Sequence, residues 1–213
     1  MRNTNTPVAV ESVPFIVGGI LAAAVTSFFG LLLPTLVALA FTAFTLFFFR
    51  NPGRHAPDVA NAVIAPADGT IIYLGPATEE HLEGEVQKIS IFMSVFNVHI
   101  NRAPVTGRVV DSFYCRGKFL DVRDERATFE NERQGLVIEA EGGQRLTVVQ
   151  VAGLIARRIV CYATTGTHLE RGRRYGLIRF GSRLDVYLPK TTELKVQMGQ
   201  KTVAGETILG ILS

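Results

Sequence analysis

The sequence predicts a mainly β domain, sandwich- or barrel-like, preceded by an apolar helical hairpin. Two observations predict this architecture. Residues 12–49 contain no charged side chain, whereas residues from 60 onward form short apolar–polar alternations separated by glycine and proline. Alternation with a period of two is typical of half-buried strands, and frequent short strands are typical of β-sandwiches and barrels. A chain of 213 residues has room for one medium domain and an appendage.

The charge-free segment is too long for one membrane span. A straight helix over residues 12–49 would measure about 57 Å, whereas a bilayer core measures about 30 Å. Pro34 is expected to break the segment into two arms, which form two short spans or a hairpin that dips into the bilayer and returns. A hairpin buried in a protein core is the alternative. The basic residues that follow at once indicate a cytoplasmic flank, so residues 1–55 are expected to associate with the cytoplasmic face of the inner membrane.

Eight segments after the hairpin have the pattern of strands, and one short helix is expected within residues 123–132. The stretch 196–212 places glycines around apolar pairs and resembles the hammerhead turns of lipoyl-like domains, but it lacks the lysine that such carriers modify. The expected strands are residues 70–75, 88–95, 107–114, 135–141, 145–153, 157–164, 184–189 and 193–198.

Composition excludes several classes of function. The formal charge of +3 is compatible with anionic partners, but no basic tract predicts binding to nucleic acid. The sequence contains no dinucleotide-binding, P-loop, HExxH or CxxC motif, and its four histidines are unpaired, so no metal is expected. Cys115 and Cys161 lie too far apart in sequence to suggest a metal cluster, and both are expected to be core residues in a reducing compartment.

Three local signals remain as candidates for chemistry. Asp68 precedes a glycine where a strand begins, and His99 follows an apolar strand. Ser182 follows Gly181 inside "LIRFGSRLDVYLP" (177–189), where a strand-like alternation continues across the pair. Each signal alone has a structural explanation, namely a turn, a histidine at the end of a strand and a β-bulge. None of them alone predicts an enzyme.

In this order, however, the motifs resemble those of phosphatidylserine decarboxylases, in the short form of bacteria and archaea. The resemblance extends from "FFRNPGR" (48–54) to the carboxyl terminus, and the apolar hairpin is similar to the membrane anchor of that family. The motifs that carry it are "PADG" (66–69), "FMSVFNVHINRAPVTG" (92–107), "ENER" (130–133), "QVAGLIARRI" (150–159) and "GLIRFGSRLDVYLP" (176–189).

The resemblance implies that residues 56–213 form a pyruvoyl-dependent decarboxylase that cuts its own chain between Gly181 and Ser182. Ser182 would attack the carbonyl of Gly181 and become a covalent pyruvoyl group at the start of a small chain that stays bound to the large one. This carbonyl would hold the amine of phosphatidylserine as a Schiff base and accept the electrons left by CO₂, which gives phosphatidylethanolamine. His99 would be the general acid, and Asp68 would support the activation of Ser182.

One position departs from the longer bacterial forms of the family. Those forms resemble a pattern with two histidines three residues apart, and here the second position holds Arg102. An arginine cannot act as a base in a protein. Either His99 therefore takes over the activation of Ser182, or backbone strain at Gly181 together with Asp68 suffices.

Two other functions stay open at this point. One is a membrane-anchored, non-enzymatic lipoyl-like β-domain that serves as an adaptor, which an uncut chain would favour. The other is a pyruvoyl decarboxylase of a different serine phospholipid. The basic residues in 156–158 and 171–174 face anionic lipid or simply form a solvated surface. Homo-oligomerisation is left open.

Overall fold

A computed structural model describes residues 6–154, 158–179 and 181–213. The chain divides into a helical unit that ends at Gly53 and a β unit, Arg54–Ser213. The elements in chain order are η1 Val10–Ser12, α1 Val13–Phe28, α2 Leu32–Phe48, β1 Ala62–Ile64, β2 Gly69–Ala77, β3 Val86–Met93, β4 Ile100–Arg102, β5 Gly107–Cys115, α3 Ala127–Glu130, β6 Arg133–Ala140, β7 Arg145–Ala152, β8 Ile159–Cys161, β9 His168–Leu169, β10 Arg174–Ile178, β11 Ser182–Pro189, β12 Glu193–Leu194, β13 Lys201–Thr202 and β14 Ile208–Ile211.

The helical unit is a hairpin of α1 and α2, and its turn differs from the expected one. The chain reverses at Gly30, whose φ of +70° is a conformation that glycine adopts without strain. Pro34 does not break the segment but lies in the first turn of α2. Proline is tolerated there because the first amides of a helix have no partner within the helix.

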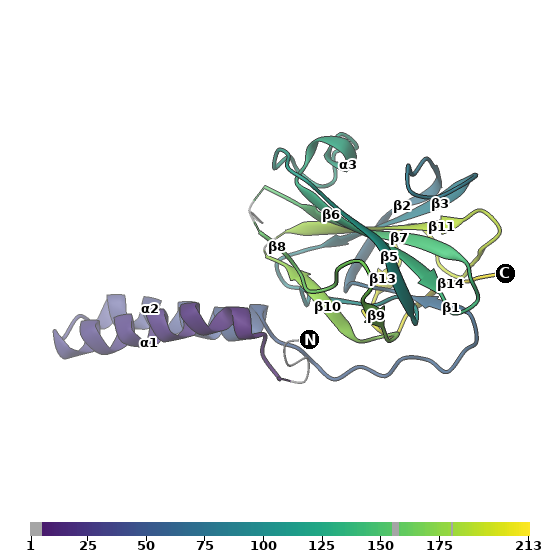
Figure 1. Cartoon of the computed structure of the whole chain (residues 1–213). Helices are drawn as coiled ribbons and strands as arrows, with labels where there is room; N and C mark the ends of the chain where they lie inside the picture. The colour runs from purple at the N-terminus through teal and green to yellow at the C-terminus, as the bar shows by residue number, and fades with distance from the viewer. Residues whose placement is uncertain (1–5, 155–157, 180) are drawn as a thin grey trace. The chain divides into compact units, whose positions relative to one another are not determined.

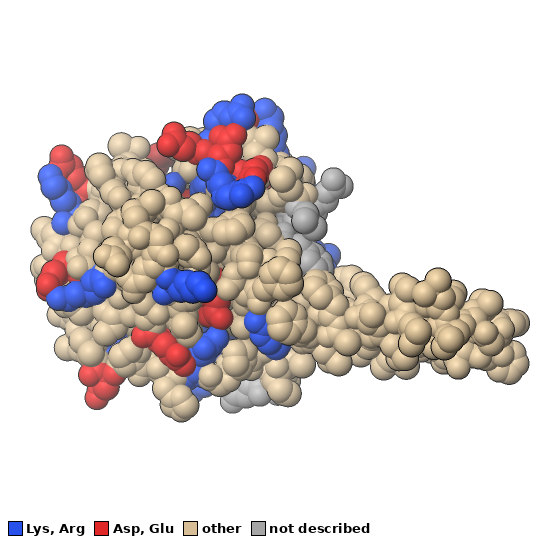
Figure 2. Space-filling view, turned by 180° about the vertical axis from the view of Figure 1, so that it is seen from behind, with Lys and Arg blue, Asp and Glu red and all other residues tan. Residues whose placement is uncertain are grey.

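Where the two helices approach most closely the hairpin packs small side chains inside, and many of its large apolar side chains are exposed. Gly19, Ala23 and Thr42 are buried, whereas Phe28 is 85% exposed. A Cβ at Gly19 would lie 2.2 Å from Thr42 Oγ1, so glycine is what lets the helices approach this closely. Residues 10–28 are long and apolar enough to cross a membrane, and no charged side chain is visible along the helices in Figure 2.

The β unit is built on one curled antiparallel sheet of eight strands, in the order β13-β2-β3-β11-β7-β6-β5-β9. Two three-stranded sheets, β4-β10-β8 and β1-β14-β12, complete it (Figure 1). The prediction of a mainly β, barrel-like domain after an apolar helical segment is thereby confirmed.

The main core lies on the inner face of the eight-stranded sheet. Leu184, Val186 and Leu188 of β11 alternate inward and are fully buried. Burying an aliphatic side chain of this size contributes about 1.5–3 kcal/mol. The expectation that both cysteines are core residues holds only in part: both are partly buried free thiols, and Cys161 packs against the main core, whereas Cys115 does not.

The segment 177–189 is not one strand with a glycine in its middle. It forms β10 and β11, which belong to different sheets, and Gly181 lies where the chain passes from one sheet to the other. The sequence pattern suggested a single strand because the apolar–polar alternation continues on both sides of Gly181 and only the glycine interrupts it. Three further expected elements are shorter than predicted, namely α3 within 123–132, β8 within 157–164 and β12 within 193–198.

Candidate active site

The Gly181–Ser182 bond lies directly before a central strand. Ser182 opens β11, between Met93 of β3 on one side and Ala152 of β7 on the other. Its side chain is 0% exposed, and its Oγ has no hydrogen-bond partner among the described residues. Buried hydroxyls in native proteins are usually paired, so an orphaned one is a candidate for chemistry.

Gly181 has a φ of +58°, in the left-handed region that favours glycine. A Cβ at this position would meet no described atom within 4 Å. Backbone conformation, rather than space for a side chain, therefore explains the glycine. A residue with a side chain would be strained there, and an altered backbone would move the carbonyl that Ser182 adjoins.

His99 lies on a chain segment whose backbone bonds to the end of β10, just before this junction. It directly precedes β4, and its carbonyl accepts a hydrogen bond of 3.3 Å from Ile178 N, at the end of β10. The imidazole is 2% exposed, and its Nδ1 lies 3.0 Å from the carbonyl oxygen of Asn97. That acceptor places the proton of the neutral ring on Nδ1, so Nε2 is the basic nitrogen.

Asp68 lies at the same end of the sheet but two strands away from Ser182. The register places Thr70 opposite Phe92 of β3, and β3 in turn lies beside β11, so the backbones are about 10 Å apart. The carboxylate accepts hydrogen bonds from Arg54 Nη2 at 2.9 Å and from Ala204 N at 2.7 Å. Asp68 thus anchors the start of β2 and does not hydrogen-bond Ser182.

Arg102, which stands at the second-histidine position, adjoins Asp68. Burial lowers the pKa of the Arg102 guanidinium; the charge of Arg54 lowers it further, while that of Asp68 opposes the shift. Arg102 Nη1 donates to the carbonyl of Gly172 at 2.9 Å. Because this side chain is a cation and a hydrogen-bond donor, it cannot supply the base that a histidine would supply at this position.

Sequence reasoning missed several residues that surround the junction. Asn101 and Gln150 form a buried amide pair with Nε2 of Gln150 2.7 Å from Oδ1 of Asn101. Gln150 lies opposite Leu184, on the face of the sheet that also carries Ser182. Gly153 lies against the carbonyl of Gly181. All three fall inside motifs that carried the family resemblance, but only their spatial arrangement distinguishes them from core residues.

The opposite face of β11 carries a separate polar cavity of about 350 Å³. Lys88, Ser90 and Arg183 contribute to its lining, and alternation along the strand turns Arg183 away from Ser182. Within residues 6–154, 158–179 and 181–213, no three or more His, Cys, Asp or Glu side chains gather as a candidate metal site.

Comparison with known proteins decides the family. The sequence model described as phosphatidylserine decarboxylase matches residues 41–210. A phosphatidylserine decarboxylase proenzyme of Geobacter metallireducens is 64% identical over 217 residues, covering all of both chains. The chain belongs to the phosphatidylserine decarboxylase family.

Other members of the family support the assignment over the full length. The proenzyme of Geobacter sulfurreducens is 67% identical over 226 residues and covers all of both chains, and that of Trichlorobacter lovleyi is 54% identical over 98% of both. The resemblance inferred from five short motifs is therefore confirmed.

Proposed function

We propose that this protein decarboxylates phosphatidylserine to phosphatidylethanolamine with a pyruvoyl group that it makes from its own Ser182. Family membership supports the substrate class. The single structural observation that supports the mechanism is the buried, unpartnered Oγ of Ser182 directly after Gly181, whose backbone is left-handed. A hydroxyl that is free of other bonds can turn toward the preceding carbonyl.

Self-cleavage would begin when Ser182 Oγ bonds to the carbonyl carbon of Gly181. The Gly181–Ser182 C–N bond breaks, and the hydroxyl proton ends on the nitrogen of Ser182, which leaves an ester. Loss of the α-proton of Ser182 then breaks its Cβ–O bond, so Gly181 leaves as a carboxylate. The dehydroalanine that remains tautomerises, takes up water and loses ammonia, which yields the pyruvoyl group.

His99 is the base that we assign to the first step. Its main chain is bonded to Ile178, three residues before Gly181, and its Nδ1 is fixed by Asn97. This leaves Nε2 as the nitrogen that can exchange a proton. After cleavage the same imidazole returns a proton to the product carbon. Asp68 and Arg102 hold β2 and β4 in place around this site.

The pyruvoyl carbonyl supplies the electron sink that decarboxylation requires. The residues of this chain provide the surroundings. The apolar inner face of β11 keeps water away, and a poorly solvated carboxylate loses CO₂ more readily because charge is dispersed in that step. Asn101 and Gln150 are the buried polar groups on this face that can orient a head group.

The hairpin is the membrane anchor that we assign to the protein. α1 and α2 have 16 and 17 residues, about 24 and 26 Å, which is slightly less than a bilayer core of about 30 Å. The turn carries only apolar residues and glycine between exposed Phe28 and Leu32. An apolar turn is unsuited to the far head-group layer, so we infer that the hairpin dips in and returns, with both ends on the cytoplasmic side.

Intact mass and a denaturing gel test the proposal. The purified wild-type chain is expected as two fragments, with the small one, 182–213, blocked at its amino terminus. Ser182→Ala should stay uncut and inactive. Ser90→Ala is the matched control, because Ser90 is also buried with an unpartnered Oγ but lies in β3 and lines the cavity on the other face. An uncut wild-type chain with full activity toward phosphatidylserine would refute the mechanism.

Vesicle assays separate the remaining functions. A cut chain that releases CO₂ from phosphatidylserine supports the decarboxylase, whereas a cut chain that acts only on another serine phospholipid would change the substrate. An uncut, inactive chain would favour an adaptor. Replacing Phe28 with Asp should weaken flotation with vesicles, because a carboxylate at the apolar turn is costly to insert.

A further inference from the structure

Gly153 faces the peptide bond that self-cleavage would cut. It follows directly after β7, whose last residue, Ala152, lies opposite Ser182. A Cβ built at Gly153 would lie 2.2 Å from the carbonyl oxygen of Gly181 and 3.3 Å from its carbon. Contacts under 3.0 Å are essentially never seen for a real Cβ. The Gly181 carbonyl therefore occupies the space that any side chain at position 153 would need.

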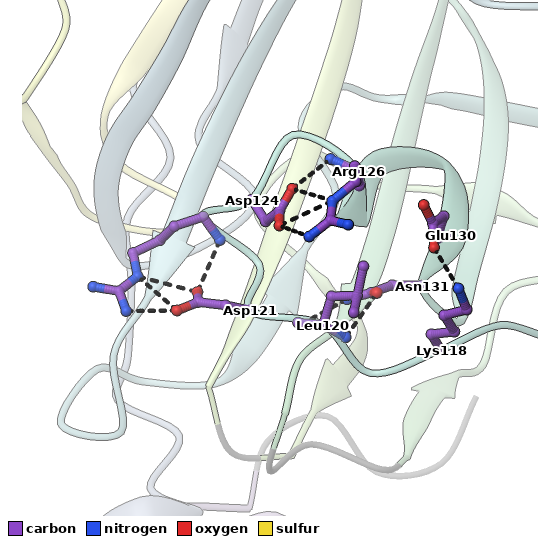
Figure 3. Close-up of polar contacts among 8 residues, drawn as sticks. Lys118, Leu120, Asp121, Asp124, Arg126, Glu130 and Asn131 are labelled. Atoms are coloured by element: carbon purple, nitrogen blue, oxygen red, sulfur yellow. Dashed lines mark hydrogen bonds and ion pairs between the residues drawn. The ribbon is translucent and has the colours of Figure 1, made fainter.

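One segment, 118–131, holds both sides of this contact through the buried side chain of Asn131 and the backbone of Val122. Asn131 is fully buried, and its Nδ2 donates to the carbonyl of Ala152 at 2.8 Å and to that of Leu120 at 2.9 Å. Its Oδ1 accepts from Leu120 N at 2.9 Å. Figure 3 shows Asn131 joined to Leu120, beside the surface ion pairs of residues 118–131. Asn131 thus fixes the residue directly before Gly153.

The same segment fixes the residue directly after Ser182. Arg183 is 3% exposed, and its Nη1 donates to the carbonyl of Val122 at 2.6 Å. A side-chain methyl of Val122 would lie 3.1 Å from a Cβ at Gly153, so a side chain at position 153 would meet a close neighbour on this side too. Gly153 and the bond before Ser182 are therefore tied to the same segment, through the hydrogen bonds of Asn131 and Arg183, which we call the frame. Moving either one away from the other would break these buried hydrogen bonds.

We propose that Gly153, held by Asn131, is a positioning residue for self-cleavage, an inference that rests on the proposed function. When Ser182 Oγ bonds to the Gly181 carbonyl carbon, that carbon becomes tetrahedral, and its oxygen gains charge and swings out of the peptide plane. The oxygen lies against Gly153, where the missing side chain leaves it room. The frame of Asn131 and Arg183 keeps the carbonyl aimed at the hydroxyl.

The test is Gly153→Ala with a matched glycine variant. Gly107→Ala creates the same clash, since a Cβ there would lie 2.2 Å from the carbonyl oxygen of Glu139, but β5 is separated from β11 by β6 and β7. Self-cleavage is followed on a denaturing gel after cell-free synthesis with detergent, and the melting temperature of each full-length variant is measured. Gly153→Ala should slow cleavage by about 100-fold, because a misplacement of about 1 Å is sufficient for such a loss. Gly107→Ala should cleave at the wild-type rate.

Hydroxylamine identifies the step that is affected, because it cuts the ester but not the peptide bond. Gly153→Ala should release no 182–213 fragment with hydroxylamine; release would place the block after the acyl shift and overturn the proposal. Cleavage of Gly153→Ala at the wild-type rate, or equal slowing of both glycine variants, would also overturn it. If Gly153→Ala does not fold, Asn131→Ala replaces it, and a wild-type rate in that folded variant overturns the role of the frame.

These outcomes are distinct from a failure of the proposed function. A wild-type chain that remains uncut refutes self-cleavage itself, and the role of Gly153 falls with it. A wild-type chain that is cut, together with a Gly153→Ala chain that is cut equally fast, leaves the proposed function intact and removes only the positioning role.

Discussion

Asp185 is predicted to be a major determinant of stability, because this one buried carboxylate contacts two buried cations. It is 1% exposed, its Oδ2 lies 2.9 Å from Arg183 Nη2 and 3.3 Å from Lys88 Nζ, and its Oδ1 lies 2.8 Å from Arg183 Nε. Asp185→Asn keeps the shape but removes the only charge that both cations contact in this cluster of Lys88, Arg183 and Asp185. Removing one partner of a buried ion pair costs about 3–5 kcal/mol, which corresponds to a melting temperature about 6–20 °C lower for a domain of this size.

The assay is thermal unfolding by circular dichroism in detergent, in the Ser182→Ala background so that one unbroken chain is measured. Glu141→Gln, at an exposed carboxylate, is the control and should change stability by less than about 0.5 kcal/mol. Burial lowers the pKa of Lys88, whereas Asp185 opposes that shift. Without Asp185 the pKa falls further, so the loss should shrink as the pH rises through the folded-state pKa of Lys88. A loss below about 1 kcal/mol at neutral pH would refute the reasoning.

Three further predictions concern single groups. His99→Ala should reduce both self-cleavage and turnover about 100-fold or more, measured as cut chain and released CO₂, and wild-type rates would remove His99 from the site. Burial raises the pKa of Cys161 to about 11, so in a Cys115→Ala chain iodoacetamide should label it a few hundred-fold more slowly at pH 8 than an ordinary thiol, with rates rising up to about pH 11; fast labelling at pH 8 would contradict this. Hydrogen bonds from Arg123 and Arg126 lower the pKa values of Asp121 and Asp124 below 3.8, so their stabilisation is complete above pH 3.8 and is lost below it. Amide-exchange protection of residues 118–131 should therefore fall before that of β7, and equal loss in both would contradict it.

The sequence predicts the long strands well because their physical signal is local. β2, β3, β5, β6 and β7 each span eight or nine residues, and each lies within three residues of its expected position at both ends. The two-residue strands β9 and β13 carry no such signal, since pairing with a distant strand alone defines them. β12 keeps only two residues of the strand expected at 193–198. The division between β10 and β11 was missed for the same reason, because membership of a sheet is a long-range property.

The candidate site is predictable in part. Ser182, Gly181 and His99 could be named from short motifs, and the structure bonds the His99 backbone to Ile178, three residues before Gly181. The contribution of Gly153 could not be predicted from the sequence, because it depends on a close approach between Gly153 and Gly181, which are 28 positions apart. Asn131 is similar, since nothing in "ENER" indicates that this amide bonds to the end of β7. Arg102 differs from these two residues. The sequence alone shows that an arginine stands at the second-histidine position, but only the fold shows which charged groups surround it.

The carboxyl-terminal strands are distributed through the β unit rather than gathered at one edge. β11 is inserted between β3 and β7, β13 extends the sheet beside β2, and β14 lies between β1 and β12. If the chain is cut between Gly181 and Ser182 as proposed, the strands of the small piece would still be paired with strands of the large piece in all three of these positions. Subunit exchange would require global unfolding, so an inactive precursor and an active one made in the same cell cannot repair each other by trading pieces.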